Sequence, residues 1–125
     1  MPQKERRKYP RAKVLLPVIM ENNRNIMSVE TQDISAGGTY IRCRSRLRHP
    51  EVNMFISVSF LSPRIRAVGE IVRSEALDSV KGGGHYGIGV RFIAISNADR
   101  EIISTEVAEH LESEFINWRK EEPEK

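Results

Sequence analysis

The stretch YGIGVRF, residues 86–92, contains the pattern on which the fold depends. Its apolar residues Ile88, Val90 and Phe92 alternate with other residues, which places them on one face of a β-strand. The glycines between them favour the tight curvature of a small barrel. Directly after this stretch the apolar spacing changes from two residues to three and four, which predicts that a helix follows the last strand.

Five earlier segments also have the pattern of short strands, because apolar and β-branched runs are separated by turn residues. The expected strands cover residues 14–20, 26–32, 39–47, 54–60, 65–73 and 86–93. Pro17 places the first strand at an edge or a bulge, and Gly69 marks a bulge or a tight bend in the fifth. This arrangement predicts a mainly β fold, either a small antiparallel barrel or a sandwich, with a helical lid.

The helix is expected over residues 98–119, where the apolar period is helical. Ser96 and Asp99 resemble a capping box at its start, and Asn97 is a competing cap. Its apolar stripe consists of Ile103, Val107, Leu111, Phe115 and Trp118. We expect this stripe to pack across the sheet or to cover one end of a barrel. The alternative is a dimer interface through its last two members.

The length of 125 residues fits one domain with a core of ordinary size. We expect a flexible basic arm at residues 1–13, a β body at 14–94, a helix at 97–119 and a disordered tail at 120–125. A single cysteine, Cys43, excludes an internal disulfide, and no Cys and His spacing suggests a metal site. The sequence has no apolar run long enough to span a membrane and no secretory signal, which predicts a cytoplasmic protein.

The net charge of +3 conceals an uneven distribution of charge. Residues 1–13 contain six Lys and Arg against one Glu, whereas the expected helix and tail are rich in Asp and Glu. A basic arm of this kind indicates an anionic partner. The alternative is that the two ends of the chain neutralise each other.

The centre of the arm is RRKYPR, residues 6–11. Pro10 opposes a continuous basic helix and drives the preceding Tyr9 towards extended geometry. The segment is therefore expected to be an extended arm that presents guanidinium groups. Arg7 and Arg11 each offer a planar fork that holds a phosphate or the O6 and N7 edge of guanine, and an arginine face also stacks on a purine.

A second polar segment, DISAGG at residues 33–38, follows the expected second strand. Asp33 can accept hydrogen bonds from guanine N–H groups, and Ser35 can donate or accept one. Gly37 and Gly38 permit positive φ and let the backbone approach a ligand closely. Alone, this pattern is a common turn between strands. Together with the basic arm it predicts two halves of one site for an anionic, guanine-bearing ligand.

The expected third strand places four arginines on one face, at positions 42, 44, 46 and 48. A solvated outer face is the simpler interpretation. Arg42 and Arg44 lie closest to the glycine turn, which leaves open a contribution to its positive field.

These two polar segments resemble a known signature. R-x-x-x-R at residues 7–11, followed by D-x-S-x-x-G at 33–38, is similar to the two-part motif of PilZ domains, bacterial receptors for cyclic di-GMP. Residues 69–73 and 86–92 resemble the later strands of that family. The resemblance extends from residue 6 into the C-terminal helix, with all signature positions present.

The resemblance implies a six-stranded antiparallel β-barrel with a C-terminal helix and a flexible N-terminal arm. In that family the arm folds over cyclic di-GMP on the barrel surface. Carried onto this chain, Arg7 and Arg11 would hold phosphate and guanine, while Asp33, Ser35 and Gly38 would contact the other side of a guanine. No cofactor, metal or catalytic activity is implied.

The residue before the first motif arginine influences whether one nucleotide or an intercalated pair is bound, and Arg6 here favours the pair. Ordering of the arm by the dianionic nucleotide would signal to a downstream partner protein. Receptors of this family serve motility, surface polysaccharide production or virulence.

Three alternatives remain beside this interpretation. Ligand-free PilZ-like adaptors act through protein contacts and usually lack the signature arginines, which this chain has. A small barrel for single-stranded nucleic acid needs stacking aromatics in a basic groove, and only Tyr9, Tyr40 and Tyr86 are candidates, beside an acidic helix. An enzyme is not expected, because the three histidines are scattered and no nucleophile is placed near a base.

Overall fold

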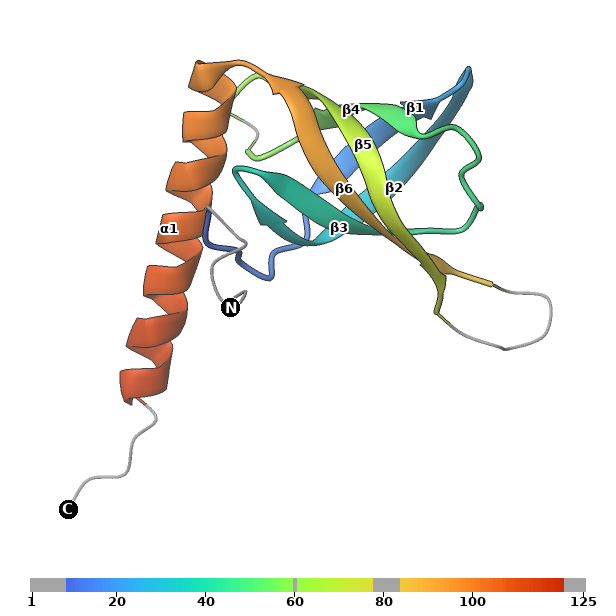
Figure 1. Cartoon of the computed structure of the whole chain (residues 1–125). Coiled ribbons are helices and arrows are strands. Elements are labelled where there is room, and N and C mark those ends of the chain that lie inside the picture. The colour runs from blue at the N-terminus through green and yellow to red at the C-terminus, as the bar shows by residue number, and fades with distance from the viewer. Residues whose placement is uncertain (1–8, 60, 78–83, 121–125) are drawn as a thin grey trace, which may run out of the picture.

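The computed structural model describes residues 9–59, 61–77 and 84–120, except for the side chains of residues 118–120. Within these residues, six antiparallel strands close into a barrel and one helix follows them (Figure 1). The elements in chain order are β1 Pro17–Asn22, β2 Asn25–Ser35, β3 Gly38–Cys43, β4 Glu51–Ile56, β5 Ile65–Ala76, β6 Tyr86–Ile95 and α1 Asn97–Lys120. The mainly β class and the C-terminal helix are confirmed, and the closed barrel excludes the sandwich. Most of the expected arm and tail lies outside the described residues.

The barrel order β1-β2-β3-β6-β5-β4 places the last strand between β3 and β5. β4 pairs with β1 and closes the barrel. The β1–β2 hairpin turns at Asn23 and Arg24, whose φ angles of 51° and 80° are those of a tight two-residue hairpin turn. Because β6 lies beside β3, Gly38 at the start of β3 pairs with Arg91. This pairing brings the turn after β2 onto the part of β6 that leads to α1.

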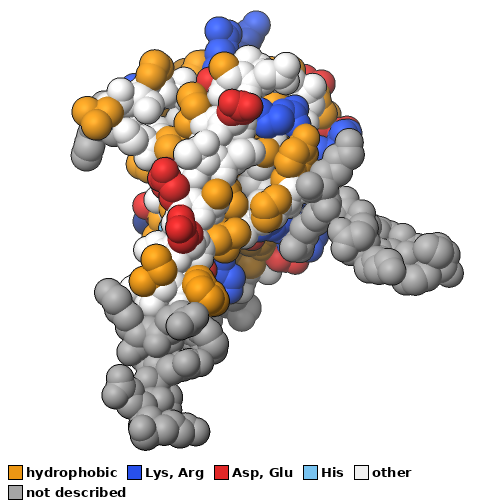
Figure 2. All heavy atoms as spheres, turned by 90° about the vertical axis from the view of Figure 1, so that its left-hand side faces the viewer, with side chains coloured by type: hydrophobic (Ala, Val, Ile, Leu, Met, Phe, Trp, Pro, Cys, Tyr) orange, Lys and Arg blue, Asp and Glu red, His pale blue; other side chains and the backbone are white. Residues whose placement is uncertain are grey.

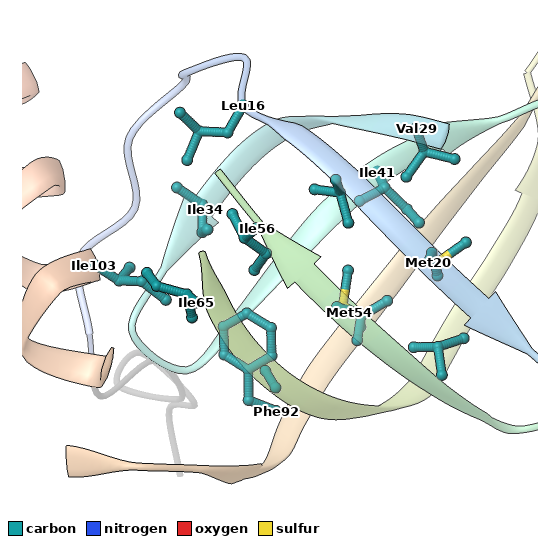
Figure 3. Packing of buried hydrophobic residues seen from close by; sticks show 14 of the residues in the cluster. Leu16, Met20, Val29, Ile34, Ile41, Met54, Ile56, Ile65, Phe92 and Ile103 are labelled. Carbon is teal, nitrogen blue, oxygen red and sulfur yellow. The ribbon is translucent and has the colours of Figure 1, made fainter. Parts of the chain in front are cut away.

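Apolar side chains from all six strands fill the barrel (Figure 3). Buried and exposed residues alternate along β1 and β4, as the period of a strand requires. The largest fully buried side chains include Met20, Ile41, Met54, Ile56 and Ile88. The expected inward faces of the strands are therefore largely those that form the core.

The entry into β1 depends on one buried hydroxyl group. Thr31 Oγ1 donates a hydrogen bond to Val14 O at 2.6 Å and accepts one from Leu16 N–H at 2.9 Å. The chain before β1 therefore crosses Thr31 instead of forming a regular strand. The expected first strand at 14–20 is wrong in this respect, because pairing begins at Pro17.

Strands end where their pairing partner ends. β3 stops at Cys43 because Cys43 pairs with Tyr86, the first residue of β6. The expected continuation is wrong, so the arginines within residues 44–48 do not form a strand face. β4 likewise ends opposite Ile65, the first residue of β5, instead of covering 54–60.

Three strands are longer than the sequence predicts: β2, β5 and β6, which continues to Ile95 instead of ending at residue 93. β2 continues to Ser35, so Asp33 and Ser35 lie on a strand and only residues 36–37 form the turn. β5 continues to Ala76, which pairs with Tyr86, the first residue of β6. The register shifts beside Gly69, but the additional residue is Ile93 on β6 and not a residue of β5. A Cβ at Gly69 would lie 2.2 Å from a Cγ atom of Val90, so a close approach requires this glycine.

The start of α1 is fixed to the barrel by hydrogen bonds. Ser96 Oγ accepts the N–H of Asp99 at 3.0 Å, which confirms Ser96 as the cap. The Asp99 carboxylate accepts the backbone N–H of Arg66 at 3.3 Å. This second bond ties the first turn of α1 to β5 instead of closing on the cap residue.

The apolar stripe of α1 divides into two parts. Ile103 and Val107 are each only 1% exposed and complete the core, whereas Leu111 and Phe115 are 36% and 55% exposed. Figure 1 shows that the C-terminal part of α1 extends beyond the barrel. The expected packing of the stripe therefore holds for its first half. The side chain of Trp118 lies outside the described residues, and the dimer interface stays a prediction.

Candidate functional site

A short backbone bridge attaches the segment before β1 to the C-terminal end of β2. The N–H of Ala12 donates to Ile34 O, and the N–H of Ile34 donates to Ala12 O, both at 3.0 Å. This bridge places Arg11 beside the side chains that flank Ile34. Arg11 Nη1 lies 3.6 Å from Asp33 Oδ2. The structure therefore brings Arg11 together with the polar end of β2, as the sequence predicts.

The carboxylate of Asp33 is only partly satisfied. Its side chain is 23% exposed, and Oδ2 faces Arg11. Oδ1 is buried and has no hydrogen-bond partner within the described part of the chain. Buried polar atoms are nearly always paired, and an unpaired one is costly. This acceptor of Asp33 is therefore suited to an N–H donor that the described residues do not supply.

Ser35 and its neighbours hold the turn between β2 and β3 in one shape. Ser35 Oγ accepts the N–H of Gly37 at 3.0 Å, and Thr39 Oγ1 donates to Asp33 O at 2.6 Å. The N–H of Phe92 donates to Gly37 O at 2.9 Å. The turn is thus fixed from both sides, by its own side chains and by β6.

The two glycines of the turn are required by the packing around them. Neither Gly37 nor Gly38 has a positive φ. A Cβ at Gly38 would lie 2.2 Å from the carbonyl oxygen of Val90, and a Cβ at Gly37 would lie 2.9 Å from Cδ2 of Tyr9. The positive φ that glycine permits is not used at either position, and the small residues are needed because neighbouring groups of the protein approach the backbone closely. The close approach of a ligand stays a prediction.

Tyr9 connects the arm to α1. Its ring lies over Gly37, and its hydroxyl accepts a hydrogen bond from Arg100 Nη1 at 2.9 Å. The guanidinium carbon of Arg100 is 5.5 Å from the centre of the Tyr9 ring. The sequence analysis did not assign this pair, because 91 positions separate its two members.

These groups surround a surface hollow of about 660 Å³, within the usual size range of small-molecule sites. Its lining includes Tyr9, Arg11, Ser35, Gly37, Gly38, Val72, Val90, Arg91, Phe92 and Arg100. Arg91 forms an ion pair with Glu70. On the face that carries α1, basic and apolar side chains lie close together beside the helix (Figure 2). Three guanidinium groups in one hollow favour an anionic ligand.

The remaining expected site residues are placed as follows. Arg6 and Arg7 lie outside the described residues. Arg42 and Arg44 line a separate hollow with Met27 and Glu30, so they are not part of the hollow around Arg11. Arg91 and Arg100 were not assigned to the site from sequence.

Other kinds of site were also considered. No helix in the described part of the chain is long and apolar enough to cross a membrane. The described residues contain no group of three or more His, Cys, Asp or Glu side chains placed to hold a metal ion. Burial raises the pKa of the Cys43 thiol, and its Sγ donates to Ser45 O at 3.1 Å. This cysteine behaves as a core residue.

The family model of the PilZ domain matches residues 5–109. The chain belongs to the PilZ domain family. This PilZ domain has no match among curated proteins. Its barrel nevertheless has close structural neighbours.

Three solved structures illustrate the likeness. The Bacillus subtilis inhibitor of motility, MotI/DgrA, has a TM-score of 0.72 at 16% identity, covering 90% of this chain and 57% of that chain. The PilZ domain of YcgR from Escherichia coli, solved with c-di-GMP, has a TM-score of 0.68 at 10% identity, covering 94% and 100%. PlzA of Borreliella burgdorferi, in complex with c-di-GMP, has a TM-score of 0.58 at 10% identity, covering 92% and 54%. The chain thus spans little more than half of MotI and PlzA.

Proposed function

We propose that this PilZ domain is a receptor for cyclic di-GMP and binds it in the hollow around Arg11. Family membership supports the proposal, as does the likeness to YcgR and PlzA, whose structures contain this nucleotide. The observation that carries it is the buried Oδ1 of Asp33, which has no hydrogen-bond partner among the described residues and lies beside the Arg11 guanidinium. A guanine offers N–H donors to the first group and an acceptor edge or a phosphate to the second.

The residues that line the hollow, and Asp33 beside Arg11, have different parts in binding. Asp33 accepts from the guanine N–H groups, and Ser35 with Gly37 and Gly38 shapes the surface against which the base lies. Arg11 binds phosphate or the O6 and N7 edge of guanine. The positive charge of the hollow favours a ligand with two phosphates.

The N-terminal arginines complete the proposed site. Arg7 binds the nucleotide together with Arg11, and Arg6 favours an intercalated pair of nucleotides. The nucleotide orders the arm against the barrel, and the new surface signals to a downstream partner protein. The protein acts in the cytoplasm, by binding and without catalysis.

Calorimetric titration with cyclic di-GMP tests the proposal. We expect micromolar or tighter binding by the wild-type chain. Arg7→Ala and Arg11→Ala should each weaken binding roughly ten- to a hundredfold, since a charge-assisted contact contributes about 1.5–3 kcal/mol. Arg64→Ala is the matched control, because Arg64 is exposed in the connection before β5 and lines a different hollow.

The possible outcomes are distinct. Binding that weakens in both arm variants but not in the control supports the receptor function, and its stoichiometry tests the role of Arg6. An absence of heat and of competition at high nucleotide concentration refutes it and favours a ligand-free adaptor. Recovery of unchanged nucleotide after long incubation tests the expected lack of catalysis.

A further inference from the structure

Across the outer surface of β6, a side chain of β3 contacts a side chain of β5. Tyr40 on β3 and Arg73 on β5 both pair with Gly89, which lies between them on β6. Glycine has no side chain to separate the two residues. The guanidinium carbon of Arg73 therefore lies over the Tyr40 ring, 5.3 Å from its centre.

A bulge places Arg73 on this side of the sheet. Ile71 pairs with Val90, and the next pair along the strand is Arg73 with Gly89, so Val72 is the additional residue. In a regular strand, Ile71 and Arg73 would point to the same face. The bulge changes the direction of the later residue, which is a common effect of bulges near functional sites. Arg73 consequently shares the outer face with Tyr40.

The ring of Tyr40 is held in place at its far end. Its hydroxyl donates a hydrogen bond to Glu75 Oε2 at 2.6 Å. Beneath it lies Gly87, where a Cβ would be 1.8 Å from the Tyr40 hydroxyl oxygen. The two glycines of β6 thus leave room for a fixed ring, and that ring supports the guanidinium of Arg73.

This pair lies next to the proposed ligand site. A smaller hollow of about 280 Å³ is lined by Arg11, Thr39, Tyr40, Val72, Arg73, Gly89 and Val90. It shares Arg11, Val72 and Val90 with the larger hollow. Arg11 therefore lines both adjoining hollows. It lies 3.6 Å from Asp33, which lines neither hollow, and Arg73 lines the smaller one.

We propose that Arg73, supported by Tyr40, forms a second purine subsite in which its guanidinium plane stacks on a base of the bound nucleotide. The inference rests on the proposed function. A cyclic dinucleotide has two bases joined through phosphates, so a ligand held at Arg11 can place one base beside Asp33 and the other against Arg73 in the smaller hollow. A guanidinium plane stacks well on aromatic rings. Arg73 is exposed, so the stack on Tyr40 leaves it accessible.

The barrel contains a matched control for this arrangement. Arg66 on β5 lies over the ring of Phe55 on β4, with its guanidinium carbon 5.7 Å from the ring centre. Arg66 is also exposed, but neither it nor Phe55 lines the two hollows at Arg11. Removing each side chain deletes the same kind of contact and the same charge at two different places.

The test compares full-length variants by titration with cyclic di-GMP. Arg73→Ala should weaken binding by about tenfold, as expected for one base stacked on a side chain. Arg73→Lys keeps the charge but loses the planar group, so it should bind nearly as weakly. Arg66→Ala should bind as the wild type does. Tyr40→Ala tests the positioning role, and in that background Arg73→Ala should cause little further loss.

Each result decides between defined outcomes. Equal affinities for Arg73→Ala and Arg66→Ala overturn the second subsite, while the receptor function stands if both bind. Full affinity in Arg73→Lys overturns stacking, because charge alone then explains the contact. Independent losses from Tyr40→Ala and Arg73→Ala overturn the support by Tyr40. A wild-type chain that does not bind the nucleotide overturns both the subsite and the receptor function.

Discussion

Alanine at Gly38 tests whether this signature glycine is required by the barrel itself. The added Cβ would lie 2.2 Å from the carbonyl oxygen of Val90 and 3.3 Å from Cα of Arg91, and both are backbone atoms. β3 and β6 must separate by nearly an ångström to relieve this contact, which weakens the hydrogen bonds of their ladder. Overpacking of this kind costs about 1–3 kcal/mol of the free energy of unfolding.

Two other glycines supply controls of graded severity. A Cβ at Gly37 meets ring atoms of Tyr9, a side chain that can move, so Gly37→Ala should cost less than about 1 kcal/mol. A Cβ at Gly84 has no heavy atom within 4 Å, so Gly84→Ala should change stability by about 0.5 kcal/mol or less. Urea unfolding followed by circular dichroism measures the free energy of unfolding of all three variants, and their dependence on urea concentration should be similar. If Gly38→Ala unfolds at the same urea concentration as Gly84→Ala, the steric argument is refuted.

Two further predictions concern the surface around the site. Arg100→Ala removes the hydrogen bond to Tyr9, so amide exchange near Tyr9 should accelerate. The affinity for cyclic di-GMP should fall about five- to thirtyfold. Unchanged amide exchange at Ala12 would contradict this prediction. The hydrogen bond to Glu75 raises the pKa of Tyr40 above its ordinary 10.0. The neutral phenol is therefore favoured by folding, and its contribution to stability is present at neutral pH and lost as the pH rises through the raised pKa. Ultraviolet titration should show a lower Tyr40 pKa in Glu75→Gln, and an unaltered value would disprove the assignment.

Period-two alternation predicts most of the barrel because burial on one face is a local property of the sequence. It does not predict where strands end, since β3 stops at Cys43 only because β6 begins opposite it at Tyr86. It also fails across bulges. The position of Arg73 on the outer face depends on the extra residue Val72, and a regular period would place it inside.

In the candidate site, too, some residues can be predicted from the sequence and others depend on the fold. Arg11 and Asp33 are predicted from sequence because the basic arm and the Asp-x-Ser-x-x-Gly segment occur together and resemble the PilZ signature. The Ala12 bridge then brings them together. Arg100 cannot be assigned that way, because an arginine in the first turn of an amphipathic helix is unremarkable until the topology places it over Tyr9. Contacts between distant segments can be predicted only when the strand order is known, and the alternation pattern does not determine that order.

The length of β2 limits how the N-terminal arm can be held. β1 pairs with β2 only as far as Glu30. Beyond it, Thr31 is hydrogen-bonded to Leu16, and the Ala12 bridge uses the edge at Ile34. Only Ser35 remains before the turn, so β2 offers no strand edge for longer pairing. Two hydrogen bonds at this bridge contribute about 1–3 kcal/mol in total. That amount is similar to a single ionic contact with a nucleotide. Under the proposed function, one bound ligand would therefore be sufficient to change the equilibrium position of the arm, and the end of β2 would set the sensitivity of the response.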